Sequence, residues 1–372
     1  MQRRPAASSI DRKGSLSIRR VLIAAASLML VLGACTGPAT PAPSATPTPP
    51  ATLAPSATPT PPATGTAGTS EDPASELSAS PSPDGAAFPR TITDDEGTQI
   101  TLEEEPERVI SLSPANTEIV FALGEGDKLV GGTDFDDFPP EAADLPDVAS
   151  FQGVVIEQVV DLEPDLVLAA GNAFTPPADI ERLRELEIPV LVVYAATVDE
   201  VLADIRLIGE AIAAEDAAAV MTQRMAERIE TITEAAGGLG TRPRVFYQIG
   251  SEPEIYGPAD ESFLADMVEL AGGAPITTGD PNAFSISLER LVDADPEVIV
   301  LGDANYGVTP EQVKARSGGW AQMTAVQDDA VRPIDDVIVT RPGPRLAEGL
   351  AALAQAIHPE LTLPPGDAAP DY

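Results

Sequence analysis

Two arginines near the end of the chain are spaced so that both could contact one ligand. Arg341 and Arg345 stand on either side of Pro342-Gly343-Pro344, a turn whose prolines fix the directions of the two side chains. A guanidinium group donates paired hydrogen bonds to carboxylates, phosphates or carbonyls. The pair is therefore a candidate for holding an oxygen-rich ligand. The alternative is a loop that forms salt bridges with the acidic surface of the protein.

The composition excludes several other kinds of site. The 372 residues include one cysteine and one histidine, which rules out an internal disulfide, a cysteine-based zinc site and a multi-histidine metal site. Neither a Gly-x-Ser-x-Gly elbow nor a P-loop occurs. The formal net charge of −37 would be repelled by a nucleic-acid backbone. We expect no enzyme, no metal site, no cofactor and no nucleic-acid partner, although a hydrolase that uses only carboxylates stays open.

The first 34 residues have the parts of a secretory signal peptide. Six arginines and lysines lie in the first 20 residues, an apolar run covers residues 21–32, and Leu-Gly-Ala-Cys ends at Cys35. The apolar run is shorter than the roughly 20 residues that a membrane-spanning helix needs. The segment resembles a bacterial lipoprotein signal, which implies that Cys35 is lipidated and begins the mature chain. A buried core cysteine is the alternative.

A Pro- and Thr-rich stretch follows Cys35, so that residues 35–87 read as a lipidated cysteine and a disordered tether. One decapeptide occurs at 43–52 and again, unchanged, at 55–64. Such a composition cannot bury enough apolar surface to offset the entropy of the chain. An extended recognition motif is the alternative to a tether.

The folded part is expected to start near Phe88 and to alternate strands with helices. Strands are predicted at 108–112, 129–131, 166–170, 190–193 and 244–249. Ser113 and Pro114 are expected to start the helix after the first strand. This alternation favours parallel sheets with helices on both faces, an α/β fold.

One long helix is predicted between two such series. Thr197 and Glu200 form a capping box, and apolar residues then recur at helical spacing to about Ala236. Elsewhere, Trp320 is expected in the core, and His358, beside a proline, at the surface end of a helix.

A weak internal repeat supports two equivalent halves. Residues 156–167 match residues 288–299 at an offset of 132, with Glu, Val, Asp and Pro identical in register. Each copy predicts a short helix, a turn and a buried strand. The alternative is that two unrelated segments acquired the same helix–proline–strand pattern independently.

Three segments carry a resemblance to a known family: residues 108–118, 159–167 and 341–345, in this order behind the lipoprotein signal. With them, residues 88–361 resemble the substrate-binding lipoproteins of ABC importers, in the class that carries cobalamin, ferric siderophores and haem. The resemblance implies two Rossmann-like lobes, 88–196 and 237–372, joined by one long rigid α-helix over 197–236. The ligand is then held in a cleft between the lobes, at strand ends such as 171–174 and 302–306.

The resemblance also suggests the ligand. Residues 134–140 and 150–153 look most like the cobalamin binders, in which large aromatic residues at the positions of Phe135 and Phe151 pack on the corrin ring. Phenylalanine stands where the family has tyrosine and tryptophan, which removes polar groups. Phe138 and, from the other lobe, Phe284 are further candidates. For each of these rings, the alternative is a position in the hydrophobic core. The arginine pair suits cobalamin amides, haem propionates and ferric siderophores alike.

Glu157 and Glu289 occupy the same position in the two repeat copies, each at the start of a short helix. In the family, one exposed acidic residue per lobe at this place meets arginines on the two permease subunits. The alternative is that each glutamate only favours its helix N-terminus.

The sequence and the resemblance together indicate a monomeric, membrane-anchored binding protein for cobalamin or a related corrinoid, which delivers it to an ABC permease dimer with its ATPase. A ferric-siderophore or haem binder is the alternative, and a surface adhesion or signalling module is a more remote one. The expected location is the outer face of the cytoplasmic membrane, with a lipid anchor.

Overall fold

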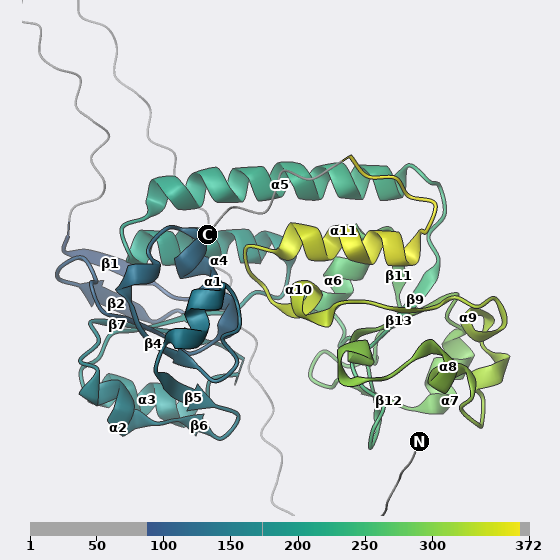
Figure 1. Ribbon diagram of the computed structural model, residues 1–372, viewed down its shortest axis with the longest axis horizontal. Helices are drawn as coiled ribbons and strands as arrows, with labels where there is room; N and C mark the ends of the chain where they lie inside the picture. Colours follow the sequence, from purple (N-terminus) through teal and green to yellow (C-terminus); the bar gives the residue numbers. More distant parts are fainter. Residues whose placement is uncertain (1–87, 173, 365–372) are drawn as a thin grey trace, which may run out of the picture. The chain divides into compact units, whose positions relative to one another are not determined.

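The computed structural model describes residues 88–172 and 174–364 (Figure 1). The predicted signal peptide, Cys35 and the tether lie outside the described residues. Within these two ranges, no helix has the length and apolar character needed to span a bilayer.

The N-terminal lobe is built on a six-stranded sheet, counted over the described residues. Its strands pair in parallel except for the last pair, β5 and β6. In sheet order they are β6 (Gly153–Val154), β5 (Asp147–Ser150), β4 (Leu129–Thr133), β3 (Val109–Ser111), β7 (Leu166–Ala170) and β8 (Val190–Val193). The predicted strands at 166–170 and 190–193 are confirmed to the residue, because each is a continuous apolar run that is buried within the sheet.

Helices follow these strands as expected. Ser113 accepts a hydrogen bond from the backbone N–H of Asn116 at 3.3 Å, and Pro114 opens the helix, which confirms the predicted start. The lobe also contains an antiparallel hairpin. Its remaining elements are α1 (Pro114–Ala122), α2 (Ile156–Asp161), α3 (Pro177–Glu185), the 3-10 turns η1 (Gly126–Lys128) and η2 (Pro140–Asp144), and the hairpin β1 (Arg90–Thr93) and β2 (Gln99–Leu102).

The C-terminal lobe has a smaller, wholly parallel sheet and a short antiparallel ribbon. In sheet order the strands are β11 (Ala274–Pro275), β9 (Arg244–Gln248), β13 (Val298–Leu301) and β14 (Val331–Pro333). The ribbon pairs β10 (Ile255–Tyr256) with β12 (Ser285–Ile286).

Six helices and two 3-10 turns accompany these strands within the described residues. They are α6 (Phe263–Leu270), α7 (Leu288–Ala294), α8 (Pro310–Lys314), α9 (Thr324–Gln327), α10 (Asp336–Thr340), α11 (Leu346–Ile357), η3 (Gly302–Tyr306) and η4 (Trp320–Gln322). Both lobes thus have the α/β architecture that the alternation of elements predicted.

The internal repeat is present in the structure. In one copy α2 leads into β7, and in the other α7 leads into β13. Each strand lies in the interior of its sheet, between two parallel neighbours. The two copies therefore place the same helix, turn and strand in equivalent positions of the two lobes.

The prediction of one helix over 197–236 is wrong, because two helices occupy the segment. They are α4 (Val198–Ala211) and α5 (Glu215–Gly237), and Ala213 between them has a left-handed backbone with φ 62°. The capping box of Thr197 with Glu200 is confirmed. The two helices pack closely, since a Cβ on Gly209 would lie 2.5 Å from Cβ of Ala218. An apolar stripe is compatible with a helix or with a helical hairpin, so the pattern alone did not reveal the break.

Helix α5, with 23 residues the longest of the described chain, links the lobes. It packs on α4 at one end and on α6 and α11 of the C-terminal lobe, and Figure 1 shows α5 and α11 side by side. The N–H of Val198 at the start of α4 also donates to Asp266 Oδ2 on α6 at 2.8 Å. One continuous apolar core includes residues from both lobes and from both linking helices.

Two smaller predictions have opposite outcomes. Trp320 is buried in the core, as expected, and the guanidinium of Arg316 lies 4.5 Å from the centre of its ring. His358 does cap the end of α11, but the prediction of a surface position is wrong. Its side chain is buried, and Nε2 lies 3.2 Å from the carbonyl of Gly272. The loop of Gly272 covers the helix end, which no local sequence pattern could indicate.

Candidate functional site

The loop that carries the two arginines reaches across to the N-terminal lobe. Arg341 ends α10 and Arg345 precedes α11, so the short helices on either side fix the loop. Between the arginines, Gly343 lies against α1, where an added Cβ would be 3.6 Å from the carbonyl oxygen of Ala115. The predicted arginine pair is therefore placed at the contact between the two lobes.

A single buried glutamate holds both guanidinium groups. Glu118 on α1 is 1% exposed at its side chain. Arg345 donates to it through Nε at 2.9 Å and through Nη2 at 2.6 Å, and Arg341 donates through Nη1 at 2.9 Å. Sequence reasoning missed Glu118, because its position on a largely apolar helix indicated only packing.

The surroundings of the pair add further contacts from the N-terminal lobe. Arg341 Nη1 also donates to Asp137 at 2.6 Å, and its Nη2 lies 3.4 Å from the carbonyl of Phe135. Burial by itself would lower the pKa of Arg341, but hydrogen bonds to Asp137 and Glu118 raise it above its ordinary value. The arginines are therefore salt-bridged, to buried Glu118 and to exposed Asp137, and their contact with a ligand stays a prediction.

Phe138 lies beneath one of these arginines. The guanidinium carbon of Arg345 is 4.1 Å from the centre of the Phe138 ring, a cation–π contact. The ring is half-buried, so one of its faces supports the arginine. In this structure Phe138 therefore positions a polar group, and its predicted contact with a ligand stays a prediction.

Phe135 and Phe151 form an aromatic pair at the end of two neighbouring strands. Phe135 follows β4 and Phe151 follows β5. Their ring centres are 4.1 Å apart with an interplanar angle of 62°, an edge-to-face arrangement. Phe135 is half-buried, whereas Phe151 is 88% exposed. The structure brings together the two residues that the sequence placed sixteen positions apart, and it rules out a core role for Phe151.

A buried carboxylate fixes the backbone beside this pair. Asp136 accepts hydrogen bonds from the N–H of Thr133 at 2.9 Å, from the Thr133 hydroxyl at 2.9 Å and from the Thr117 hydroxyl at 2.9 Å. Burial raises the pKa of Asp136, against the opposing effect of these hydrogen bonds and of the positive charge of Arg341. The carboxylate ties the end of β4 to α1, and so orients Phe135.

Two more aromatic side chains follow strands of the same sheet. Phe174 lies beyond β7 and is 74% exposed, and Tyr194 lies directly after β8 and is also exposed. The amide of Asn172 donates to the Tyr194 hydroxyl oxygen at 2.9 Å. The sequence identified the strand end at 171–174 but not these rings as site residues. For Tyr194 the available signal was an aromatic residue placed immediately after a buried apolar run.

The equivalent strand ends of the C-terminal lobe carry polar groups. Gln248 at the end of β9 donates to Asp303 Oδ1 at 2.9 Å and to Oδ2 at 2.7 Å. Arg316 in turn donates to Gln248 at 2.8 Å and to Ser251 at 2.7 Å. Burial raises the pKa of Asp303, although the hydrogen bond from Gln248 and the charge of Arg316 oppose the shift.

Exposed rings in the C-terminal lobe are more scattered. Tyr306, at the end of η3 after β13, is 81% exposed. Phe284 is exposed beside the ribbon strand β12, and its carbonyl accepts a hydrogen bond from Gly257. Among the described residues, no ring contact joins Phe284 to Phe135 or Phe151. Its role opposite the aromatic pair stays a prediction.

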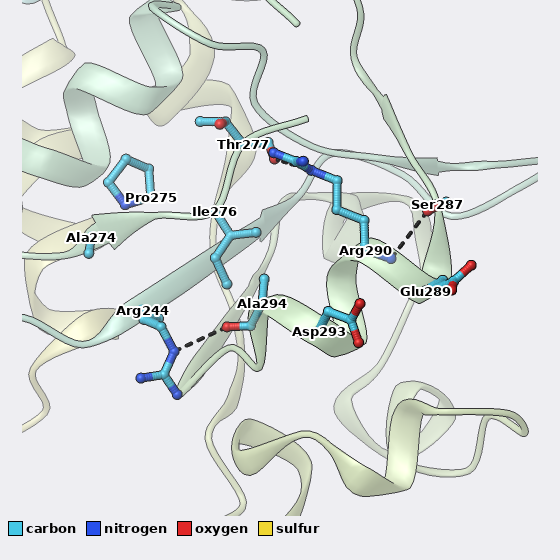
Figure 2. A pocket seen from close by; sticks show the side chains of 10 residues that line it. All are labelled: Arg244, Ala274, Pro275, Ile276, Thr277, Ser287, Glu289, Arg290, Asp293 and Ala294. Atoms are coloured by element: carbon cyan, nitrogen blue, oxygen red, sulfur yellow. Dashed lines mark hydrogen bonds between the residues drawn. The ribbon is translucent and has the colours of Figure 1, made fainter. Parts of the chain in front are cut away.

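Glu289 stands beside a surface pocket of the C-terminal lobe. The pocket, about 840 Å³ in volume, is lined by residues of β9, β11 and α7, including Arg244, Glu289, Arg290 and Asp293. In Figure 2 the Arg290 side chain extends toward Thr277, and the side chains of Glu289 and Asp293 lie along α7. Arg244 and Arg290 donate to backbone carbonyls, and Glu289 and Asp293 are the acidic residues of the lining.

Glu157 has the equivalent place in the N-terminal lobe. It is exposed in the first turn of α2, as Glu289 is exposed in the first turn of α7. The matched positions that the repeat predicted are therefore present. Their function as a docking pair stays a prediction.

Comparison with known proteins identifies relatives of similar sequence. The chain is 35% identical over 277 residues to an uncharacterized ABC transporter substrate-binding lipoprotein of Bacillus subtilis, over 73% of this chain and 87% of that protein. It is 33% identical over 282 residues to a cobalamin-binding protein of Halobacterium salinarum, over 73% of this chain and 75% of that protein.

A solved structure shares the fold. The periplasmic vitamin B12 binding protein of Vibrio cholerae is 28% identical and superposes with a TM-score of 0.58, over 68% of this chain and 96% of that one. A model of the periplasmic binding protein family matches residues 109–337, which is more than half of the sequence. With two α/β lobes joined by a helix and a match of this extent, the chain belongs to the periplasmic binding protein family.

Proposed function

We propose that this protein is the substrate-binding component of an ABC importer and that it captures cobalamin or a related corrinoid. The observation that carries the choice of ligand is the edge-to-face pair of Phe135 and Phe151 at the ends of β4 and β5. The relatives named for cobalamin or vitamin B12 support the same choice. The importer function itself follows from the family, whose members bind solutes for transport and are not enzymes.

The chemistry of the strand ends is compatible with a flat macrocycle. Exposed rings offer faces and edges for stacking, which adds roughly 0.5–1.5 kcal/mol per aromatic contact beyond the burial of apolar surface. A corrin also carries amide side chains around its rim, which need hydrogen-bonding partners. In the other lobe Arg316, which is half-buried beside Gln248 and Ser251, is the candidate for such a contact.

A direct binding measurement tests the ligand. Full-length protein in detergent is titrated with cyanocobalamin, with haem and with a ferric hydroxamate siderophore, and binding is followed by calorimetry and by the shift of the thermal midpoint. We expect saturable binding of cyanocobalamin at one site. A clear response to the siderophore or to haem, with none to any corrinoid, would identify the protein as a binder of that other ligand.

We further propose that Glu157 and Glu289 dock the protein on its permease. One exposed carboxylate per lobe, at equivalent positions of the repeat, suits a partner with twofold symmetry and a basic residue on each subunit. Glu289 lines a surface pocket between β9, β11 and α7, which leaves room beside it for a side chain of the partner. An ATPase bound to the permease then completes the importer.

The proposed location is the outer face of the cytoplasmic membrane, through a lipid on Cys35. The lipoprotein name of the Bacillus subtilis relative supports this anchor. Stable attachment needs more than one acyl chain, since a single chain binds only marginally. Cys35→Ala is therefore expected to release the protein from the membrane fraction with ligand affinity unchanged. A variant that stays in the membrane would contradict the anchor.

A further inference from the structure

Glu118 occupies a position that the proposed capture of a ligand leaves unexplained. It is the charged residue of α1, and its side chain is only 1% exposed. Burial of a charge is costly unless the charge is paired and hydrogen-bonded. Among the described residues, its salt-bridge partners are Arg341 and Arg345, both from the other lobe.

This pairing uses the hydrogen-bonding capacity that the arginines would otherwise offer to a ligand. Nε and Nη2 of Arg345 both donate to Glu118, and the ring of Phe138 supports the same guanidinium. Arg341 donates to Glu118 and Asp137. The two positive charges are thus matched by two carboxylates of the N-terminal lobe.

The neutralised cluster adjoins the aromatic pair. Arg341 Nη2 lies 3.4 Å from the carbonyl of Phe135, whose ring contacts Phe151. An anionic ligand at these rings would meet no net positive charge, and the exposed carboxylates of Asp134 and Asp137 lie on the same loop. To bind such a ligand, the arginines would have to leave Glu118 buried and unpaired.

We propose that Glu118 is a specificity-determining residue, which neutralises the arginine pair so that the site selects ligands without negative charge and excludes anionic ones. This inference rests on the proposed function, and it adds a ligand class: uncharged chelates whose rims carry amides. Carboxylate-bearing macrocycles and tris-catecholate iron complexes belong to the excluded class. Repulsion between like charges at a binding site weakens the binding of the wrong ligand, and it adds little to the affinity for the right one.

Two corrinoids that differ in the groups around the corrin rim, amides in one and carboxylates in the other, test the selection. Dicyanocobinamide has amides around the corrin ring, and dicyanocobyrinic acid has free carboxylates in their place. We expect the full-length protein to bind the amide form roughly 100-fold more tightly. In Glu118→Gln, where one guanidinium charge is no longer matched, we expect that ratio to fall by roughly tenfold, chiefly through tighter binding of the carboxylate form.

A matched control separates the site from the net charge of the protein. Glu230→Gln removes the same charge from an exposed position on α5, and it should leave the ratio unchanged. Equal binding of both corrinoids by the original protein, or the same ratio in Glu118→Gln, would overturn the role of Glu118 while leaving the importer function in place. Failure to bind either corrinoid would contradict the proposed function and this inference with it.

A second measurement does not depend on the folding of a variant. When salt is raised from about 50 mM to about 500 mM, screening should increase the affinity of the original protein for the carboxylate form by roughly fivefold and leave that for the amide form unchanged. The opposite salt effect, weaker binding of the carboxylate form, would mean that the arginines attract anions, and it would overturn the proposal.

Discussion

At the carboxyl ends of their parallel strands, the two lobes present different chemistry on similar scaffolds. In the N-terminal lobe aromatic side chains follow four strands: the half-buried Phe135 and the exposed Phe151, Phe174 and Tyr194. In the C-terminal lobe the corresponding positions hold the hydrogen-bonded cluster of Gln248, Asp303 and Arg316, with one exposed ring at Tyr306. The two copies of the repeat therefore have the same helix–turn–strand scaffold, whereas the segments that follow the strands differ. We infer that the N-terminal lobe supplies apolar contact and the C-terminal lobe supplies polar contact.

The largest expected effect is on stability, at Asp136 and Asp303, the buried carboxylates beside the strand ends of the two lobes. Asp136→Ala would leave two hydroxyl donors and the backbone N–H of Thr133 without their acceptor, at a cost of about 2–3 kcal/mol. Asp303→Ala should cost less, because the donors left without an acceptor are the side-chain amide of Gln248 and, at 3.5 Å, the hydroxyl of Ser251. Urea unfolding followed by circular dichroism measures both. A larger loss for Asp303→Ala would reverse this part of the comparison.

The next effect concerns the matched pair of surface glutamates. Glu157→Lys with Glu289→Lys should slow uptake of the ligand at least roughly tenfold, because both contacts with the permease become repulsive. Ligand affinity should stay within error, since neither residue belongs to the strand ends. Each single variant should show an intermediate rate if both lobes dock. Normal uptake by the double variant would mean that these residues do not form the docking pair.

A smaller effect separates the aromatic lobe from the polar one. Phe151→Ala should weaken corrinoid binding by about tenfold, through lost stacking and lost apolar burial. Tyr306→Ala should weaken it by about twofold, since that ring stands apart from the pair formed by Phe135 and Phe151. Calorimetric titration of the two variants gives the ratio directly. Similar losses in both would show that the ligand contacts the lobes alike.

The smallest expected effect is a difference in pH sensitivity. Burial raises the pKa of Asp204 on α4 to about 8, and the nearby carboxylates of Asp95 and Glu200 add to the shift. The folded protein therefore keeps a proton that the unfolded chain releases above about pH 4, so this group makes stability fall as pH rises from about 4 to about 8. Asp204→Asn should flatten that slope, by about 1 kcal/mol between pH 5 and 7.5 once solvent screening is allowed for.

Thermal unfolding at the two pH values measures this slope. Circular dichroism follows the whole fold, while fluorescence of Trp320, the single tryptophan, reports from the C-terminal lobe. If the lobes unfold together, both signals should show the same flattening. An unchanged slope in the variant would mean that Asp204 is ionised in the folded protein at neutral pH.

Much of the fold could be predicted because its signals are local. The apolar runs that became β7 and β8, the Ser113 cap before Pro114 and the Thr197 capping box each depend on neighbouring residues alone. The failures occurred where distant segments meet. His358 is buried by the loop of Gly272, and the helical segment after Thr197 turns back at Ala213 so that Gly209 can pack on Ala218.

The residues of the candidate site likewise divide into those that had a sequence signal and those that had none. The arginine pair, the two rings at 135 and 151 and the matched glutamates were predicted from turn chemistry, a family resemblance and an internal repeat. Tyr194 was missed although an aromatic residue directly after a buried run was a usable signal. Glu118 had no such signal, because its partners lie more than 200 residues away in the sequence.

The sequence by itself determined the α/β alternation, the duplicated helix–turn–strand unit and the residue types available at each strand end, because these follow from local periodicity and backbone preference. The tertiary structure alone decided which charges meet. A guanidinium has the same sequence pattern whether it faces a ligand or a buried carboxylate, and only the approach of the loop at Gly343 to α1 brought Arg341 and Arg345 onto Glu118. Electrostatic pairing depends on distance in space, and that distance is set by how the two lobes pack.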